Sequence, residues 1–460
     1  MSRTLNIIIL VIALLSSIFI AKLLTTSTSF ITLAFVAAIA VIIPTFIKPS
    51  VGVYILAISM LLSPEINVLE MPARSIIVRL DDIFIIVISL TWLVRNAIYK
   101  QAKLFKKTPL NKPIMLYIVV CILSSTLGVL RGDTSPMIAI FYTMKYIEYL
   151  LLYFVVVNTI DSLSQVKRIL GLALVVSIIV TIHAYYQISL GNSPYCPFDI
   201  EKGIVESATL GGYLLIVFGM LLGMIVYEKK LPVLMLFVLL FVINIPPFVQ
   251  TVSRASYLSF AFILIGFFIL TKKRRFLYLT ALLVGMVIFL STSKGLIELM
   301  SYRIKYTTAG TFAQTTPTRI AGVNLVIEES AAIRVEFWRR IFTQYLPTHP
   351  LLGTGVSKLN VEGQIPLVIK ETGLFGLTAF LWMLITIWKE TRRLYDTHPD
   401  NFVKGIALGF LTAFIGILGQ SLTTNTFIII RIMEPFWLIA GLIMVLRTEQ
   451  RGTQRACQII

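Results

Sequence analysis

The sequence predicts an all-α protein, a polytopic bundle of about 12–14 transmembrane helices with one large extracytoplasmic loop between late helices. Of its 460 residues, 57% are hydrophobic and only 13% are charged, which is more apolar material than a water-soluble core can bury. Runs such as 5–20 and 277–290 carry no charge and approach the roughly 20 residues that a helix needs to cross a bilayer. Because hydrocarbon offers no partners to backbone polar groups, these runs are expected to be helical.

Apolar runs interrupted by charges, Pro or Gly predict the position of each span. The predicted spans lie near residues 5–22, 29–47, 50–62, 76–95, 113–130, 138–157, 167–190, 207–227, 231–249, 254–271, 276–291, 366–388, 402–422 and 425–446. The first run follows Arg3 as in a signal peptide, but no small-residue cleavage site follows it, so a retained helix is expected. The run at 50–62 is short enough to be only half inserted.

These spans divide the chain into three parts. Residues 1–291 form an N-terminal transmembrane bundle, 292–365 an extracytoplasmic loop with short helices, and 366–460 the C-terminal transmembrane helices and a cytoplasmic tail. The loop contains an amphipathic stretch at 333–345, and loops of this length are usually functional or disordered.

The distribution of basic residues predicts the orientation. If the N-terminus is cytoplasmic, 23 of the 40 Lys and Arg residues lie on the cytoplasmic side. The short outer loops hold only Lys22, Arg74, Arg79, Arg131 and Lys202. The positive-inside rule therefore predicts a multi-pass protein of the cytoplasmic (inner) membrane, with both termini cytoplasmic and loop 292–365 extracytoplasmic.

Charge and cysteine usage narrow the possible partners. The net charge of +18 would suggest nucleic acid in a soluble protein, but here the basic residues flank apolar spans, so membrane lipids and no nucleic acid are the expected partners. Cys121, Cys196 and Cys457 lie far apart and form no metal-ligand pattern. The sequence therefore predicts no disulfide framework, no metal and no cofactor.

Ionisable residues within the predicted spans are few and gather toward the outer ends: Lys145, Glu148, Arg254, Lys370, Glu371 and Arg431. Such residues usually face a protein interior or a water-filled cavity. A structural ion pair or a snorkelling side chain is the alternative for Lys145 with Glu148 and for Lys370. The forked donors of Arg254 and Arg431 match phosphate oxygens, which favours an anionic ligand.

Three motifs follow one another in and after the loop. They read RVEFWRR at 334–340, HPLLGTG at 349–355 and ETGLFGL at 371–377. Their order resembles the O-antigen ligase and O-antigen polymerase superfamily of bacterial surface-polysaccharide enzymes, as do SRAS at 253–256 and RLDD at 79–82. The resemblance is clearest from about residue 250 to 390 and implies a metal-independent glycosyltransferase with a polyprenyl-pyrophosphate-linked glycan as donor and a glycan, lipid or protein as acceptor.

The chemistry of that reaction suggests roles for individual residues. Negative charge builds on the leaving pyrophosphate, so fixed cations stabilise the transition state, and we expect Arg254 and Arg334 to do so with support from Arg431. The resembled ligases carry a His-Asn pair about nine residues before the Glu of the third motif, whereas Glu362 and Gly363 occupy those positions here. Glu362 is therefore the candidate general base; the alternative is that the chain is a polymerase or a divergent relative that uses another group.

Further residues are predicted to bind the pyrophosphate or substrate: Lys145, Trp338, His349, Gly353, Gly355 and Glu371. Gly353 and Gly355 could let the backbone approach the ligand or could serve only a tight turn. His349 has the alternative of a turn residue before Pro350. Trp338 could stack on a sugar or seat the loop on the membrane.

Two other functions are compatible with the sequence. A transporter or flippase of lipid-linked oligosaccharides would also have many helices and a cationic cavity, but it would be expected to place its site near the bilayer midplane. A membrane scaffold would tolerate replacement of the outer arginines.

Overall fold

The structure is a computed structural model that describes residues 30–70, 75–99, 105–198, 200–201, 204–271, 315–320, 323–357 and 362–459. The predicted spans near 5–22 and 276–291 lie outside these residues, as does the first part of the predicted loop.

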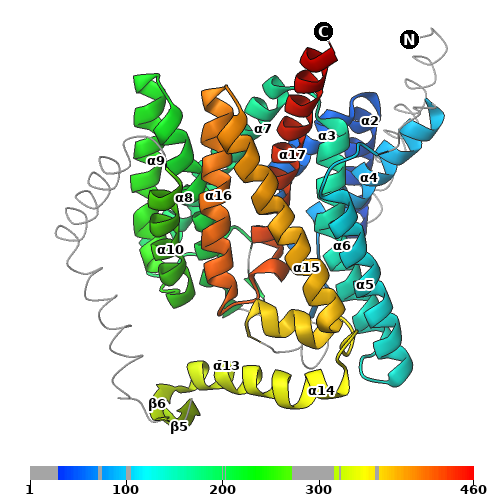
Figure 1. The fold of residues 1–460 in the computed structure, drawn as a ribbon, viewed down its shortest axis with the longest axis vertical. Helices are drawn as coiled ribbons and strands as arrows, with labels where there is room; N and C mark the ends of the chain where they lie inside the picture. Colours follow the sequence, from blue (N-terminus) through cyan, green and yellow to red (C-terminus); the bar gives the residue numbers. More distant parts are fainter. Residues whose placement is uncertain are drawn as a thin grey trace.

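The described chain is almost wholly helical, which confirms the predicted all-α class (Figure 1). Its helices are α2 (Phe30–Ile47), α3 (Pro49–Leu62), α4 (Leu80–Ile98), α5 (Asn111–Arg131), α6 (Pro136–Thr159), α7 (Leu163–Ser189), α8 (Ser207–Tyr227), α9 (Leu231–Gln250), α10 (Arg254–Leu270), α13 (Glu329–Arg340), the π-helix η1 (Ile341–Tyr345), α14 (Leu346–Thr348), α15 (Gln364–Thr397), α16 (Asn401–Ser421), the 3-10 helix η2 (Thr426–Ile428) and α17 (Ile430–Ile459). Three short antiparallel hairpins pair β1 (Glu65–Glu70) with β2 (Ser75–Arg79), β3 (Ile200–Glu201) with β4 (Ile204–Val205), and β5 (Thr315–Ile320) with β6 (Val323–Glu328).

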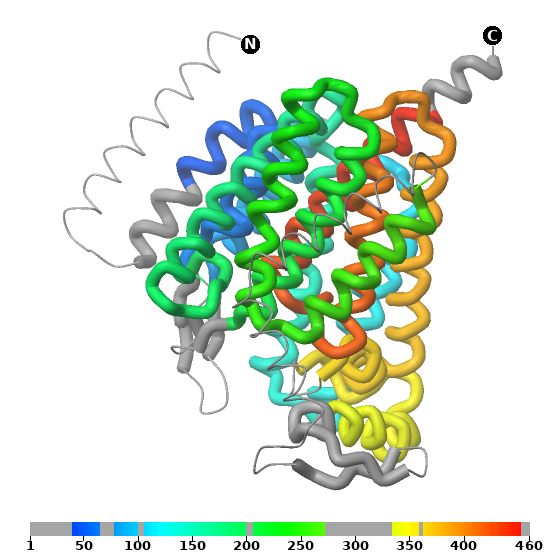
Figure 2. The backbone as a smooth tube through the Cα atoms, turned by 90° about the vertical axis from the view of Figure 1, so that its left-hand side faces the viewer, coloured from blue at the N-terminus to red at the C-terminus, as the bar shows by residue number. Residues whose placement is uncertain are grey.

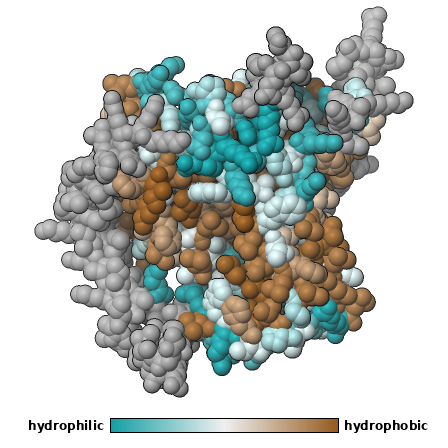
Figure 3. Space-filling model, in the orientation of Figure 1, coloured by the Kyte–Doolittle hydropathy of each residue, from teal (hydrophilic) through white to brown (hydrophobic). Residues whose placement is uncertain are grey.

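Helix length and composition identify a multi-pass membrane protein. Among the described residues, seven helices are long and apolar enough to cross a membrane, namely α5, α6, α7, α8, α9, α15 and α16, and α3 and α10 are shorter apolar helices. Apolar side chains form a broad belt between more hydrophilic ends (Figure 3). Outward-facing residues of α9 such as Leu239, 53% exposed, would contact lipid tails.

The two ends of the bundle differ: one bears the loop that contains α13 and α14, and the other bears a group of basic residues. We name the two ends after these features. At the loop end, α13 and α14 lie across the bundle and lead into the turn at 349–355, called the loop turn (Figures 1 and 2). Helices α6, α8, α10, α15 and α17 begin at this end. The opposite end, where α7, α9 and α16 begin, is called the basic end because Lys167, Arg168, Lys229 and Lys230 lie there.

Helices α8 and α16 form the centre of the bundle, and small residues let them approach closely. A Cβ added to Gly219 would collide with the backbone of Ala413, and one added to Gly223 would collide with the backbone of Gly409. Close contacts of this kind are typical of membrane helix pairs, which gain their stability from packing and have little hydrophobic driving force between them.

Several predicted boundaries shift in the structure. The predicted span 76–95 begins as strand β2, and its helix starts only at Leu80. The predicted last span near 425–446 begins at Ile430, because residues 422–429 form a turn that contains η2 and is buried at Phe427. The amphipathic stretch at 333–345 is helical as predicted, in α13 and η1.

Candidate functional site

The loop turn is hydrogen-bonded into a break in helix α15. Gly373 has φ +64° and ψ −160°, which interrupts the helix immediately before its long apolar stretch. Leu374 and Phe375 follow the break, and their backbone N–H groups donate to the carbonyls of Pro350 at 2.9 Å and Leu351 at 3.1 Å. The loop turn thus satisfies donors that the break removes from the helix.

The carbonyls on the other side of the break are satisfied in the same way. The N–H groups of Thr354 and Gly355 donate to the carbonyls of Lys370 at 2.8 Å and Glu371 at 3.1 Å. Gly353 has φ +62°, and a Cβ there would collide with the Lys370 carbonyl. This supports the tight-turn interpretation of the two glycines, because their backbone approaches another backbone; a ligand contact stays a prediction.

Glu371 anchors the loop turn to helix α6 from inside the protein. Its side chain is 1% exposed, and Oε2 accepts a hydrogen bond from the Tyr146 hydroxyl at 2.7 Å. Its Oε1 accepts from the backbone N–H of Ser357 at 3.0 Å. Glu371, predicted to bind substrate, thus joins α6 to the segment that follows the loop turn.

Two of the three predicted catalytic residues meet in the structure. Arg334 Nε lies 2.5 Å from Glu362 Oε2, and their side chains are 30% and 47% exposed. The same Nε donates to the carbonyl of Thr423 at 3.2 Å, in the turn between α16 and α17. The pair joins helix α13 to the loop end of the bundle while leaving both groups accessible.

The rest of α13 carries a surface network and an aromatic pair. Glu336 Oε2 accepts from Arg339 at 2.7 Å and its Oε1 from Arg340 at 2.9 Å. These two guanidinium groups lower the pKa of the Glu336 carboxyl to about 2. Trp338 stacks on Phe342 with ring centroids 5.9 Å apart, and stacking on a sugar stays a prediction.

His349 and Lys370 contact other parts of the loop end. Nε2 of His349 lies 3.4 Å from Asp133 Oδ2, just beyond α5. The Lys370 ammonium lies 5.2 Å from the centre of the Tyr345 ring. His349 is thus a residue that holds the loop turn against the α5–α6 connection, in agreement with its alternative interpretation.

Six charged side chains meet inside the bundle near the loop end and form what we call the buried charge cluster: Arg79, Asp81, Asp82, Lys145, Glu148 and Glu434. Arg79 Nη2 lies 2.7 Å from Asp81 and 3.7 Å from Glu434. Lys145 contacts Asp82 and lies 3.3 Å from Glu148. Lys145 thus joins α4 to α6 through ion pairs, in line with its alternative interpretation, and its binding of substrate stays a prediction.

The cluster brings three carboxylates close enough to be considered for a metal. Oxygens of Asp81, Asp82 and Glu434 lie within 4.8 Å of one another. However, Arg79 and Lys145 already contact these carboxylates, and a divalent ion would have to compete with both fixed cations. The arrangement fits an internal ion-pair network better than a metal site.

The other two predicted arginines lie at the same end of the bundle as Arg334. Arg431 is buried, and its Nη1 donates to the carbonyl of Leu61 at 3.3 Å. Arg254 is the first residue of α10, half-buried at the loop end, and α10 is held to α16 by a 3.3 Å hydrogen bond from Gln420 to Ser256. All three arginines thus lie at one end of the bundle; their facing one pocket stays a prediction.

Glu434 and the partners of Arg79 were missed as site residues by sequence reasoning. Glu434 lies three residues after Arg431 inside an apolar helix, and a buried carboxylate there is as costly as the arginine. The spacing of Arg431 and Glu434, one turn apart in an apolar helix, was the feature of the sequence that could have identified Glu434.

Comparison with known proteins finds no family model that matches this chain and no curated protein that matches it significantly.

Proposed function

We propose that this chain is a membrane glycosyltransferase that acts on polyprenyl-pyrophosphate-linked glycans at the outer face of the cytoplasmic membrane, as an O-antigen ligase or a polysaccharide polymerase does. The observation that carries the proposal is the Arg334–Glu362 pair, 2.5 Å apart and accessible. It combines a phosphate-binding cation and a carboxylate base at the loop end, beside the turn that leads to Arg431.

In the proposed reaction, an acceptor hydroxyl attacks the anomeric carbon of the donor sugar. The new glycosidic bond forms as the bond between that carbon and the pyrophosphate oxygen breaks, and its electron pair stays with the pyrophosphate. Arg334, with Arg254 and Arg431, stabilises this developing charge. The carboxylate of Glu362 accepts the hydroxyl proton, and Arg334 holds it in position.

The same arrangement argues against alternating access. The candidate site residues Arg254, Arg334, Glu362 and Arg431 all lie at the loop end, whereas the sites of many transporters lie near the midplane, between repeats. Transport of lipid-linked oligosaccharides is the alternative that the experiment must distinguish.

The test is transfer of a polyprenyl-pyrophosphate glycan by the purified full chain in lipid vesicles. We expect Arg334→Ala and Glu362→Gln each to lower the rate about 10²-fold or more. Arg339→Ala is the matched control, because Arg339 lies on the same helix, exposed and paired with Glu336; its rate should equal that of the wild type. Full activity in both site variants, or movement of the donor across the bilayer without glycan transfer, would overturn the proposal.

A further inference from the structure

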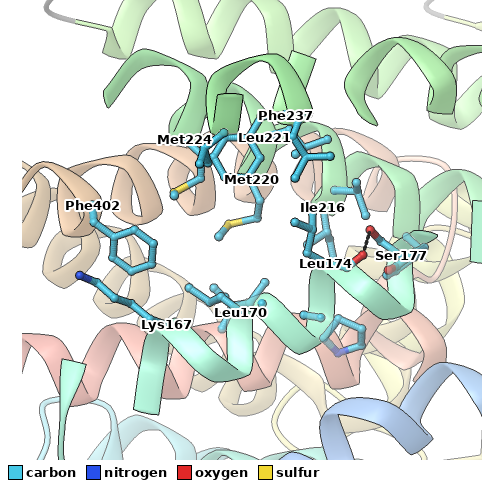
Figure 4. A pocket seen from close by; sticks show the side chains of 18 residues that line it. Lys167, Leu170, Leu174, Ser177, Ile216, Met220, Leu221, Met224, Phe237 and Phe402 are labelled. Carbon is cyan, nitrogen blue, oxygen red and sulfur yellow. Dashed lines mark hydrogen bonds between the residues drawn. The ribbon is translucent and has the colours of Figure 1, made fainter. Parts of the chain in front are cut away.

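A cavity of about 330 Å³ lies between α7, α8, α9, α16 and α17, away from the loop end. Its volume falls in the range of roughly 300–1,000 Å³ that is usual for small-molecule sites. Side chains of Leu170, Leu174, Ile216, Met220 and Phe237 line it (Figure 4). Ser177 also faces it, but its hydroxyl is satisfied by the Leu174 carbonyl at 2.8 Å. The interior therefore favours a hydrocarbon chain.

The cavity reaches the lipid-facing surface of the bundle. Three of its lining residues are exposed, Lys167 and Gly171 on α7 and Leu236 on α9, and Leu236 is 41% exposed. Neighbouring residues on both helices are apolar and exposed, including Val175 at 53% and Leu239 at 53%. A chain from the surrounding bilayer could thus enter between α7 and α9 without crossing water.

One end of the cavity carries a cation. Lys167 lines the cavity beside Phe402, and its ammonium lies 5.0 Å from the centre of that ring (Figure 4). This cation–π contact holds the ammonium at the cavity mouth. The exposed Lys229 and Lys230 lie at the same end of the bundle, so an anionic group would be attracted there.

We infer that this cavity binds an anionic glycerophospholipid, with one acyl chain among the apolar side chains and the headgroup phosphate at Lys167. The cation and the apolar interior form one continuous surface, which matches an amphiphile with a single negative head. The donor of the proposed transferase reaction would present its pyrophosphate at the loop end, opposite Lys167. A lipid of the leaflet at the basic end is therefore the better match.

The chain offers a matched pair of variants for the headgroup. Lys167 and the adjacent Arg168 are both exposed, but only Lys167 lines the cavity. If binding is specific, only Lys167→Ala should reduce it. A general attraction to the basic end would be weakened equally by both substitutions.

A substitution at Gly171 should block the apolar part of the cavity, where the acyl chain of the lipid would lie. Gly171 lines the cavity, and a Cβ added to it would meet no atom within 4 Å. Gly171→Phe should therefore project a ring into the cavity without a clash, and the helix should tolerate it because glycine is among the poorest helix formers.

The experiment is native mass spectrometry of the purified full chain, titrated with phosphatidylglycerol, phosphatidylcholine of the same chain length, or a polyprenyl phosphate. We expect wild type and Arg168→Ala to prefer phosphatidylglycerol over phosphatidylcholine about fivefold, the effect of one basic residue near a headgroup. Lys167→Ala should remove the preference, and Gly171→Phe should remove saturable binding of both lipids.

Three results would overturn the inference: equal loss of preference in Lys167→Ala and Arg168→Ala, unchanged binding in Gly171→Phe, or tighter binding of the polyprenyl phosphate than of phosphatidylglycerol. Should Gly171→Phe fail to fold, the comparison of Lys167→Ala with Arg168→Ala decides the question alone.

Discussion

Tyr146 donates a 2.7 Å hydrogen bond from its hydroxyl to the buried carboxylate of Glu371. This single contact links helix α6 to the point where the loop turn is inserted into α15. Since the other carboxylate oxygen accepts from the Ser357 backbone, Glu371 holds together two segments that are distant in sequence. The loop end is therefore anchored from the interior of the bundle.

Removal of the Tyr146 hydroxyl should weaken this anchor. Tyr146→Phe removes a buried hydrogen bond to the carboxylate of Glu371, which costs about 1–3 kcal/mol of unfolding free energy. Denaturant unfolding measures the loss, and limited proteolysis should show faster cleavage near the loop turn. Tyr186→Phe, at an exposed position on α7, serves as control; equal stability of the two variants would contradict the anchor.

Two of the glycines with positive φ at this end should differ sharply in their tolerance of alanine. Gly132 has φ +81° with open space around it, whereas Gly353 has φ +62° and faces the Lys370 carbonyl. Gly132→Ala should cost only the conformational strain, about 1–2 kcal/mol. Gly353→Ala adds a backbone collision and should lower the thermal unfolding midpoint considerably more; a similar shift in both variants would show that the turn can move aside.

Much of the bundle could be predicted because hydrophobic runs report burial in lipid directly. The amphipathic pattern at 333–345 likewise predicted helical structure, found as α13 and η1, because opposite faces of a surface helix differ in polarity. The insertion of 350–355 into the break of α15 could not be predicted, since it consists of backbone hydrogen bonds, and these leave no pattern of side chains. The glycines at 353 and 373 were visible in the sequence, but their partners were not.

The sequence allowed individual residues of the candidate site to be proposed, but it did not predict which of them lie in contact. Arg334 and Glu362 were assigned separate roles, and their direct contact depends on how the loop folds back onto the turn between α16 and α17. Lys145 was expected near Glu148 from the spacing on one helix. Its second partner, Asp82, lies 63 residues earlier, beyond the reach of any local pattern.

Neutralising Lys145 should destabilise the bundle by leaving Asp82 and Glu148 without their ammonium partner. Loss of one partner from a buried ion pair typically costs about 3–5 kcal/mol, so Lys145→Met should unfold at clearly lower temperature. The double variant Lys145→Met with Asp82→Asn should recover part of the loss. If Lys145 also binds substrate, the double variant would regain stability but would not regain glycan transfer. Equal stability of Lys145→Met and wild type would contradict the ion-pair role.

The ion pairs on α13 should respond to acid with a defined sign. The pKa of Glu336 is lowered from 4.5 to about 2 by Arg339 and Arg340, so its folded state favours the ionised form. Its stabilising effect on the helix is present above about pH 4.5 and is lost as the pH falls toward 2. Hydrogen exchange of α13 should be faster in Glu336→Gln than in wild type near pH 6, and this difference should vanish near pH 2; a difference independent of pH would contradict the assignment.

At the basic end, Glu390 should contribute far more stability than an ordinary surface carboxylate. It is 4% exposed and accepts hydrogen bonds from Arg393 at 2.7 Å, Arg447 at 3.1 Å and Arg451 at 2.8 Å, which joins α15 to α17. The side chains of Arg393 and Arg451 are partly exposed and that of Arg447 is buried, so the loss of their shared anion in Glu390→Gln is expected to cost about 1–3 kcal/mol.

The control for Glu390 is Asp161→Asn, which removes the exposed partner of Lys106 near the same end. Asp161 is 71% exposed, and pairs of this kind contribute about 0–1 kcal/mol. Denaturant unfolding of the two variants in matched detergent compares them directly. Raising the salt concentration should weaken the Lys106 pair and leave the Glu390 contacts largely intact, because buried charges are screened less than exposed ones. A Glu390→Gln variant as stable as Asp161→Asn would mean that helix packing alone holds α17 against α15.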